Sequence, residues 1–297
     1  MVPEDDSLLA DGVRAERAGA LDRAADSFAA AVEASDDPAV RSEALRHLAD
    51  VHRTRCLWDR ALDFARQAQQ VAAVAGLEQH RVEAVNAEVN ILITRGDFPA
   101  AIPKLEAVAR ADVDPRLRGI ALQNLGSILA QTGQQGAAAR AFRESLGCFQ
   151  AADYTRGQGI ALNNLGRLML DTGDAPEARP LLEAALAAAR AVEDNDLVAL
   201  VSLNLASVLC ASGENEGAQD LAMSALGYFS QCDNRYREIE CLRLIGDINV
   251  RCEDIANAER CYDLSLRLAE EIGADVEARL SRDRLRQLQS SSHRSHN

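Results

Sequence analysis

The sequence predicts an all-α protein built as a helical repeat, and three observations lead to this prediction. The chain of 297 residues is 47% hydrophobic but only 4% aromatic, which suits a large core but not the aromatic and β-branched richness of sheets. Small residues recur at a nearly constant interval along the chain. Within each interval, apolar residues follow the i, i+3, i+4, i+7 spacing of an amphipathic helix.

The repeat is anchored by three small residues of one stretch, Gly166, Gly173 and Ala178. We call these positions the crossing residue, the turn residue and the second-helix alanine. They recur at steps of 40 residues from Gly126 to Gly246, and at steps of 37 or 40 residues before Gly126. The alanine is present in all seven copies: Ala24, Ala61, Ala101, Ala138, Ala178, Ala218 and Ala258. Self-similarity at a fixed period over seven copies predicts a solenoid.

Each copy has the features of a helical hairpin. In the fifth copy, Leu165 and Met169 lie on one face of a first helix. Gly173 suits the left-handed residue that ends a helix, and Asp174 followed by Pro176 suits the start of the next helix. A glycine or alanine where the two helices cross allows their backbones to approach closely. We therefore expect seven pairs of antiparallel helices.

The repeat register sets the expected boundaries. The array spans residues 1–273, with helix pairs near 5–34, 38–75, 77–110, 115–152, 155–193, 195–232 and 235–273. A capping helix is expected over 274–289, with Val276, Leu280, Leu285 and Leu288 on its apolar stripe, and a disordered polar tail over 290–297. Because no tract of Pro, Ser or Gly interrupts the pattern between residues 7 and 289, we expect one continuous body.

The pattern resembles the tetratricopeptide repeat over roughly residues 7–273. The resemblance is carried by the pairs Leu125-Gly126, Leu165-Gly166, Gly96-Asp97 and Gly173-Asp174, by the seven alanines, and by Phe28, Phe142 and Tyr262 four residues after three of them. The period of 40 residues is similar to the long-helix variety of kinesin light chains, spindle-orientation adaptors and bacterial regulators. The chain departs from the pattern at Cys56 and Glu253 (turn residue), at Val89 (crossing residue), and at Glu88 and Asp11, where an apolar residue is usual.

The resemblance implies a right-handed superhelix whose concave face is lined by the first helix of each pair. It also implies a non-enzymatic protein–protein interaction module that binds a peptide segment or helix of a partner in this groove, as an adaptor or scaffold. The alternative is a peptide- or effector-sensing regulator that changes its superhelical shape and signals through a separate output partner. The sequence does not predict the oligomeric state.

Amides stand out on the groove side of the first helices. Asn124, Asn164 and Asn204 occupy one equivalent place in three successive copies. The remaining candidates are Gln123 and Asn163 beside them, and Asn86 and Asn90 in the third copy. An amide offers one acceptor and two donors, which complement a peptide backbone. Asparagine is also a mediocre helix former, so a ligand-binding ladder is our hypothesis, and simple solvation of an exposed face is the alternative.

Arginines accompany these amides. Arg46, Arg167 and Arg243 are expected in the groove, where a guanidinium can bind a carboxylate with two hydrogen bonds. The alternative is that these arginines are solvated or paired within the chain, which is the commoner outcome for arginine. Lys104 is the only lysine and is not expected in the groove. The lysine–asparagine clamp that chaperone-binding relatives use for a carboxyl terminus is therefore not reproduced.

Several function classes are disfavoured. The net charge of −14 argues against a nucleic-acid partner. The acidic start carries no secretory signal, and we expect no apolar window of about 18 residues that would span a bilayer. A cytoplasmic protein without a membrane partner is therefore expected.

Cysteine and histidine provide no credible catalytic or metal site. The seven cysteines form no Cys-x-x-Cys pair and are expected to be buried. Glu43, His47 and Asp50 share a helix face, but no second histidine lies at ligand spacing on it. No set of nucleophile, base and orienting group is found. We therefore expect no metal, no cofactor and no enzymatic activity.

Overall fold

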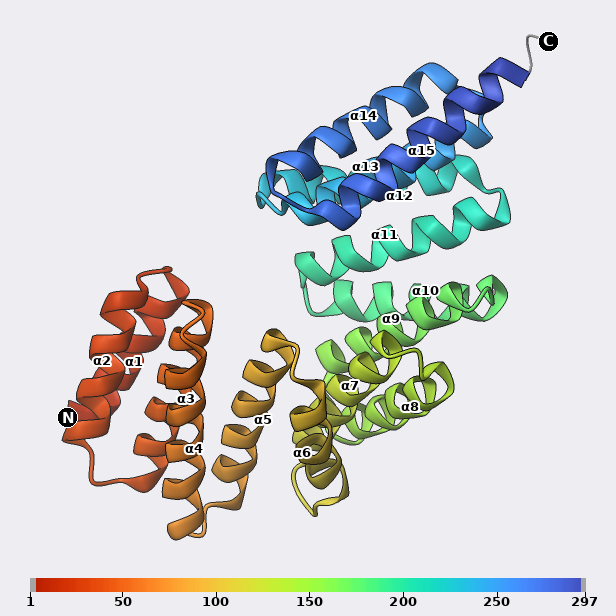
Figure 1. Ribbon diagram of the computed structural model, residues 1–297. Helices are drawn as coiled ribbons and strands as arrows, with labels where there is room; N and C mark the ends of the chain where they lie inside the picture. Colours follow the sequence, from red (N-terminus) through yellow and green to blue (C-terminus); the bar gives the residue numbers. More distant parts are fainter. Residues whose placement is uncertain (1–3, 295–297) are drawn as a thin grey trace. The chain divides into compact units, whose positions relative to one another are not determined.

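The computed structural model describes residues 4–294, and over this range the chain forms fifteen helices and no strand (Figure 1). The predicted all-α class is confirmed. The chain divides into two compact units, of which the first ends at Tyr154 and the second begins at Thr155. The sequence predicted one body, because the division falls between two helix pairs where neither the period nor the composition changes.

Each unit is a series of helix pairs joined by short turns. The first unit contains α1 (Glu4–Arg17), α2 (Leu21–Ala34), α3 (Pro38–Thr54), α4 (Trp58–Val74), α5 (Glu78–Arg95), α6 (Phe98–Arg110), α7 (Pro115–Gln131) and α8 (Gln135–Ala151). The second contains α9 (Thr155–Asp171), α10 (Ala175–Ala191), α11 (Asn195–Ser212), α12 (Asn215–Gln231), α13 (Arg235–Arg251), α14 (Ile255–Glu271) and α15 (Asp275–Arg294). Odd-numbered helices from α1 to α13 are the first helices of the pairs, and even-numbered helices are the second.

The closest approach within a pair occurs at the crossing residue. All seven second-helix alanines are fully buried, with none of their surface exposed. A Cβ atom at Gly126 would lie 2.6 Å from Cε1 of Phe142, and one at Gly166 would lie 2.7 Å from Cγ of Leu182. Real Cβ atoms do not come so close to other carbons. The bulky residue on the second helix therefore requires a glycine opposite it on the first.

The turns inside the pairs keep one geometry even where the glycine is missing. Gly173 has a φ of 85°, and the Asp174 side chain accepts a hydrogen bond from the Glu177 amide at 3.1 Å, as the sequence predicts. Cys56 and Glu253 occupy the turn position with φ values of 57° and 61°. These L-residues adopt the left-handed region because the flanking helices fix the turn.

Glu88 departs from the apolar pattern and is fully surrounded by protein. Its side chain is 3% exposed and accepts hydrogen bonds from Lys104 at 2.8 Å, Gln69 at 2.9 Å and Arg66 at 3.3 Å. Burial raises the pKa of Glu88, but the hydrogen bonds from Lys104 and Gln69 and the Lys104 charge outweigh it and hold the pKa below its usual value. The chain's only lysine thus neutralises a buried carboxylate and joins α5 to α6.

The C-terminal helix packs differently from the prediction. Val276 and Leu280 are 67% and 44% exposed, whereas Ala278, Ser281 and Leu288 are buried. The buried residues follow spacings of three and seven, which places Val276 and Leu280 on another face. The helix also continues through Arg294, into the tail expected to be disordered from residue 290, because no glycine or proline interrupts it. Residues 1–3 of the expected array and 295–297 of the tail lie outside the described residues.

Helix α11 contradicts the expectation that no window of about 18 apolar residues is present. Residues Asn195–Ser212 of α11 are long and apolar enough to cross a membrane, but 61% of this window is buried within the protein. The helix packs against α9, α10, α12 and α13. Its apolar character is explained by contact with these neighbours on most sides, as expected for a core helix.

The register can be tested with two alanines near one turn. Ala218 is fully buried at the crossing of α11 and α12, and Ala211 is exposed on α11. We expect Ala218→Leu to lower the free energy of unfolding by about 1–3 kcal/mol through overpacking, and Ala211→Leu to change it by less than about 0.5 kcal/mol. Chemical denaturation measures both, and equal effects would show that the register is wrong.

The Glu88 network predicts a specific pH dependence. Because the folded-state pKa of Glu88 lies below its unfolded value of about 4.3, the stability that Glu88 gives the fold is complete above that value and is lost as the pH falls through the lowered folded pKa.

Lys104→Met should lower the unfolding free energy at neutral pH by about 1–3 kcal/mol. Adding Glu88→Leu should restore most of it. Arg110→Met, which breaks the surface pair with Glu106, should cost less than about 1 kcal/mol. No recovery in the double variant would contradict this explanation.

Candidate functional site

One repeat position on the first helices carries half of the candidate residues. It lies three residues before the crossing residue and holds Arg46, Asn86, Gln123, Asn163, Leu203 and Arg243 from α3 to α13. Five of these six residues are polar. Their partners determine whether they are available to a ligand, so we describe them unit by unit.

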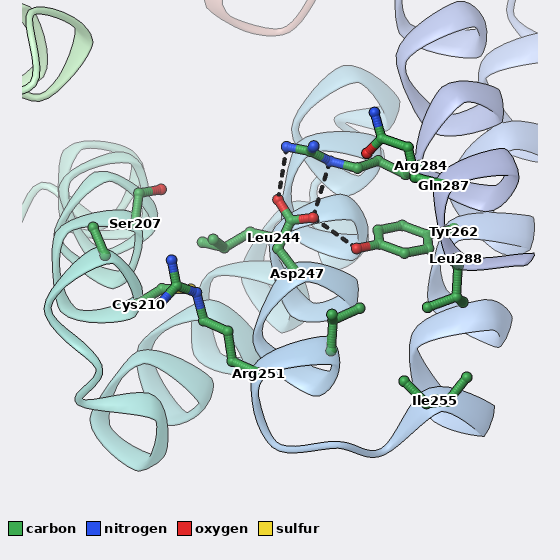
Figure 2. Close-up of a pocket in the computed structure, with 12 residues that line it drawn as sticks. Ser207, Cys210, Leu244, Asp247, Arg251, Ile255, Tyr262, Arg284, Gln287 and Leu288 are labelled. Carbon is green, nitrogen blue, oxygen red and sulfur yellow. Dashed lines mark hydrogen bonds and ion pairs between the residues drawn. The ribbon is translucent and has the colours of Figure 1, made fainter. Parts of the chain in front are cut away.

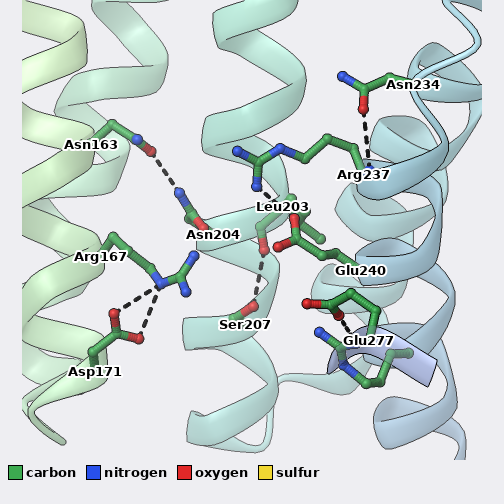
Figure 3. A network of polar contacts seen from close by, with 11 residues as sticks. Asn163, Arg167, Asp171, Leu203, Asn204, Ser207, Asn234, Arg237, Glu240 and Glu277 are labelled. Atoms are coloured by element: carbon green, nitrogen blue, oxygen red, sulfur yellow. Dashed lines mark hydrogen bonds and ion pairs between the residues drawn. The ribbon is translucent and has the colours of Figure 1, made fainter. Parts of the chain in front are cut away.

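In the second unit, two of the predicted amides bind each other. Nδ2 of Asn204 on α11 donates to Oδ1 of Asn163 on α9 at 2.8 Å, and the two residues are only 4% and 3% exposed (Figure 3). The expectation that both amides are solvated and unpaired is therefore wrong for the observed state. Asn163 lies in the seam between successive first helices, where burial requires a hydrogen-bond partner. Asn164 is half-buried, and its Oδ1 atom lies 3.5 Å from Nδ2 of Asn163.

The predicted arginines are also paired. Arg243 on α13 forms an ion pair with Glu277 on α15. Arg167 contacts both carboxylate oxygens of Asp171, at 3.0 and 3.1 Å, one turn further along α9. These contacts agree with the alternative of pairing within the chain. The Arg167 pair is exposed on both sides, so its exchange for a ligand carboxylate would cost little.

In the first unit, the amides are less completely paired. Nδ2 of Asn124 on α7 donates to Oδ1 of Asn90 on α5 at 3.4 Å, a weak bond between exposed groups. Arg46 lies 3.8 Å from Glu43 and 3.9 Å from Glu83. Asn86 is 8% exposed, and its Oδ1 atom has no hydrogen-bond partner among the described residues. An unpaired buried amide is costly and marks this part of α5 as unusual.

Arg46, Asn86 and Asn90 line one cavity of about 370 Å³, which we call the α3–α7 cavity. Its other walls are Asp50, Gln79, Glu83, Ala87, Asp114, Arg116, Leu117 and Ile120. Three carboxylates and two guanidinium groups give it a mixed, slightly acidic character. The structure thus brings Arg46 of the second copy together with Asn86 and Asn90 of the third.

Arg167, Asn204 and Arg243 line a second cavity of about 200 Å³, the α9–α13 cavity. Its other walls are Leu170, Asp171, Leu203, Ser207, Glu240, Leu244 and Asp247. Its three candidate residues are already paired, Arg167 with Asp171, Asn204 with Asn163, and Arg243 with Glu277. Gln123, Asn124, Asn163 and Asn164 line neither cavity.

A third and larger cavity was not predicted. The α13–α15 cavity has a volume of about 610 Å³ and is lined by Ser207, Cys210, Ala211, Leu244, Asp247, Val250, Arg251, Ile255, Tyr262, Arg284, Gln287 and Leu288 (Figure 2). Asp247 accepts a hydrogen bond from the Tyr262 hydroxyl at 2.7 Å and pairs with Arg284 at 3.0 Å. The sequence predicts α15 only as a capping helix, and this prediction does not include a cavity lined by Arg284, Gln287 and Leu288.

Glu43, His47 and Asp50 share one face of α3, and His47 is held there by residues of the first helix pair. His47 stacks on Phe28 with ring centroids 4.7 Å apart, and its Nδ1 lies 3.0 Å from Glu16. The side chain thus joins α3 to the first helix pair. Among residues 4–294, no group of three or more His, Cys, Asp or Glu side chains is arranged to hold a metal ion.

The cysteines are all free, but the expectation that they are buried holds only in part. Cys148, Cys210 and Cys241 are buried, Cys261 is half-buried, and Cys56, Cys232 and Cys252 are exposed. The exposed three lie in turns at helix ends, where a residue projects into solvent. Burial raises the pKa of Cys241 to about 12, so this thiol stays protonated.

Comparison with known proteins identifies the repeat type. Two models described as tetratricopeptide repeat match residues 86–154 and 157–231. No protein among curated sequences matches this chain.

Solved structures with the same fold include three that illustrate its range. BtubC (BKLC) from P. vanneervenii is 19% identical, with 73% of this chain and 90% of that chain covered and a TM-score of 0.59. A Rap protein complexed with Competence and Sporulation Factor is 16% identical over 96% and 74%, with a TM-score of 0.63. The quorum sensor NprR from B. thuringiensis is 14% identical over 88% and 75%, with a TM-score of 0.70.

The buried amide pair makes a prediction opposite to that for solvated asparagines. Asn204→Ala leaves Oδ1 of Asn163 without its donor, so we expect the unfolding free energy to fall by about 1–3 kcal/mol. Replacing both residues by leucine should be nearly neutral, because no polar atom is then left unpaired. Asn164→Ala is the matched control and should change stability by less than about 0.5 kcal/mol. Thermal and chemical denaturation of the variants would decide, and unchanged stability of Asn204→Ala would contradict the pairing.

Proposed function

We propose that this chain, whose residues 86–154 and 157–231 match models of the tetratricopeptide repeat, is a non-enzymatic interaction module whose first helices bind a peptide segment or helix of a partner protein. The observation that carries the proposal is the α3–α7 cavity. There, one buried amide whose oxygen has no partner, one exposed amide and an arginine line a space of about 370 Å³. Such groups complement the donors and acceptors of an extended backbone.

The chemistry of the cavity favours a peptide over other ligands. A peptide backbone presents a donor and an acceptor at every residue, so it can satisfy Asn86 and Asn90 whatever its side chains are. The mixed charges of Arg46, Glu83 and Asp114 suit polar side chains of either sign. Nucleic acid is disfavoured by the net charge of −14. We propose the role of an adaptor or scaffold in the cytoplasm.

A second candidate function is that of a peptide-sensing regulator. It is favoured by the similarity to a quorum sensor and to a Rap protein solved with a bound factor. In this case, ligand binding would change the arrangement of the helices and signal to a separate output partner. Hydrogen exchange in the presence of peptide distinguishes the two: an adaptor gains protection at the binding helices, whereas a regulator also changes protection in helices that do not contact the peptide.

The proposal can be tested with peptides selected from a random display library against the whole chain. We expect the double variant Asn86→Ala, Asn90→Ala to bind such peptides about 10- to 100-fold more weakly, because backbone groups of the peptide lose their partners. The unfolding free energy should not fall by more than about 0.5 kcal/mol, since Oδ1 of Asn86 has no partner to lose.

Gln67→Ala is the control, because it removes an exposed amide from the second helix α4. Calorimetric titration should give the same affinity for this variant as for the natural chain. Equal affinities of all three proteins would refute the proposed site.

A further inference from the structure

We infer that the α13–α15 cavity binds a bulky apolar side chain of the partner peptide together with an adjacent carboxylate. The inference rests on the proposed function and specifies the partner's chemistry in the second unit. It is drawn from the walls, the mouth and the charge of this cavity, which no candidate from the repeat pattern anticipated.

The walls provide an apolar compartment of suitable size. Leu244 from α13 and Leu288 from α15 face it, and the buried ring of Tyr262 from α14 is also part of its lining (Figure 2). A volume of about 610 Å³ exceeds that of a phenylalanine or leucine side chain and falls in the usual range of ligand sites. Val250 and Ile255 also line it and remain 37% and 41% exposed. Burying them would provide the hydrophobic part of the binding energy.

Some polar side chains of the cavity already have hydrogen-bond or ion-pair partners within the chain. Asp247 is engaged by the Tyr262 hydroxyl at 2.7 Å and by Arg284 at 3.0 Å (Figure 2). Its charge is therefore offset by that of Arg284. This three-residue contact joins α13, α14 and α15 and holds the wall in place, so a ligand need not reorganise it.

Arg251 is the group left for a ligand. It is exposed and forms no ion pair with any residue between 4 and 294. Its charge acts on Cys210 on the opposite wall, where burial raises the pKa of the thiol and Arg251 partly offsets the rise. Figure 2 shows the Arg251 side chain reaching from α13 toward Cys210 on α11, and both residues line the cavity. With Arg284 and Asp247 in balance, the lining carries one net positive charge in a chain of net charge −14.

An unpaired guanidinium beside an apolar compartment selects a definite ligand chemistry. A carboxylate can bind Arg251 through two parallel hydrogen bonds, while a neighbouring apolar side chain fills the space between α13 and α15. We commit to a peptide in which phenylalanine or leucine stands next to aspartate or glutamate. A free apolar carboxylate is the competing occupant, and it is separated from the peptide by the test.

The experiment measures fluorescence anisotropy of three labelled peptides in a Gly/Ser background, binding to the whole chain. One peptide carries Phe next to Glu, the second Phe next to Gln, and the third Ala next to Glu. We expect the first to bind about tenfold more tightly than either of the others, which corresponds to one charge-assisted contact or one buried ring.

Two variants and a control assign these differences to the cavity. Arg251→Gln should abolish the preference for Glu over Gln and leave the preference for Phe over Ala. Ala211→Trp, which fills the cavity from an exposed position on α11, should abolish both preferences without loss of helical circular dichroism. Arg279→Gln removes the same charge from an exposed residue of α15 outside the cavity and should change neither.

Three results would overturn the inference. In the first, the Glu preference persists in Arg251→Gln or disappears equally in Arg279→Gln. In the second, the peptides do not bind at all while library-selected peptides still depend on Asn86 and Asn90, which refutes this inference and leaves the proposed function intact. In the third, free 4-phenylbutyrate displaces the first peptide with an affinity equal to or tighter than that of the peptide, which identifies a small carboxylate as the occupant.

Discussion

The steric limit at each helix crossing is the constraint on which the rest of the structure depends. The second-helix alanine has no exposed surface in any of the seven pairs. Where a bulky residue stands four positions after this alanine, as Phe142 does, a glycine such as Gly126 on the first helix leaves room for its side chain. Once these two helices are locked, their polar residues are fixed in direction. The first helices then present one row of side chains to their neighbours in the stack and another to the open surface.

This geometry explains why similar residues have different roles in the two units. Asn163 and Asn86 occupy the same repeat position, yet Asn163 is bound by Asn204 whereas Oδ1 of Asn86 has no partner. The next first helix supplies an equivalent amide in both units, but Asn204 donates to Asn163 whereas Asn124 donates to Asn90 instead. A polar residue at this position therefore joins neighbouring repeats or keeps an unpaired atom, depending on its neighbour rather than on its own identity.

Much of the fold could be predicted from the sequence, because a repeat supplies the same evidence seven times. The turns at Cys56 and Glu253 keep the geometry of the glycine turns. The repeat register is therefore correct even in the copies that lack the turn glycine. The site was harder to predict. Periodicity places Asn204 on a face but does not reveal that Asn163 lies within hydrogen-bond distance. The partners of Glu88 come from α4 and α6, and those of Asp247 from α14 and α15, and such contacts between helices have no signature in one helix's pattern.

The Glu88–Lys104 contact has a practical chemical consequence. Since the chain has a single lysine, reagents that acylate primary amines can modify one side chain and the amino terminus. That side chain already lies 2.8 Å from a buried carboxylate, so carbodiimide activation would join α5 and α6 through an amide bond of zero spacer length. Such a bond would link the two helices of the third pair through the chain's only lysine, and mass spectrometry would detect it as a cross-linked peptide.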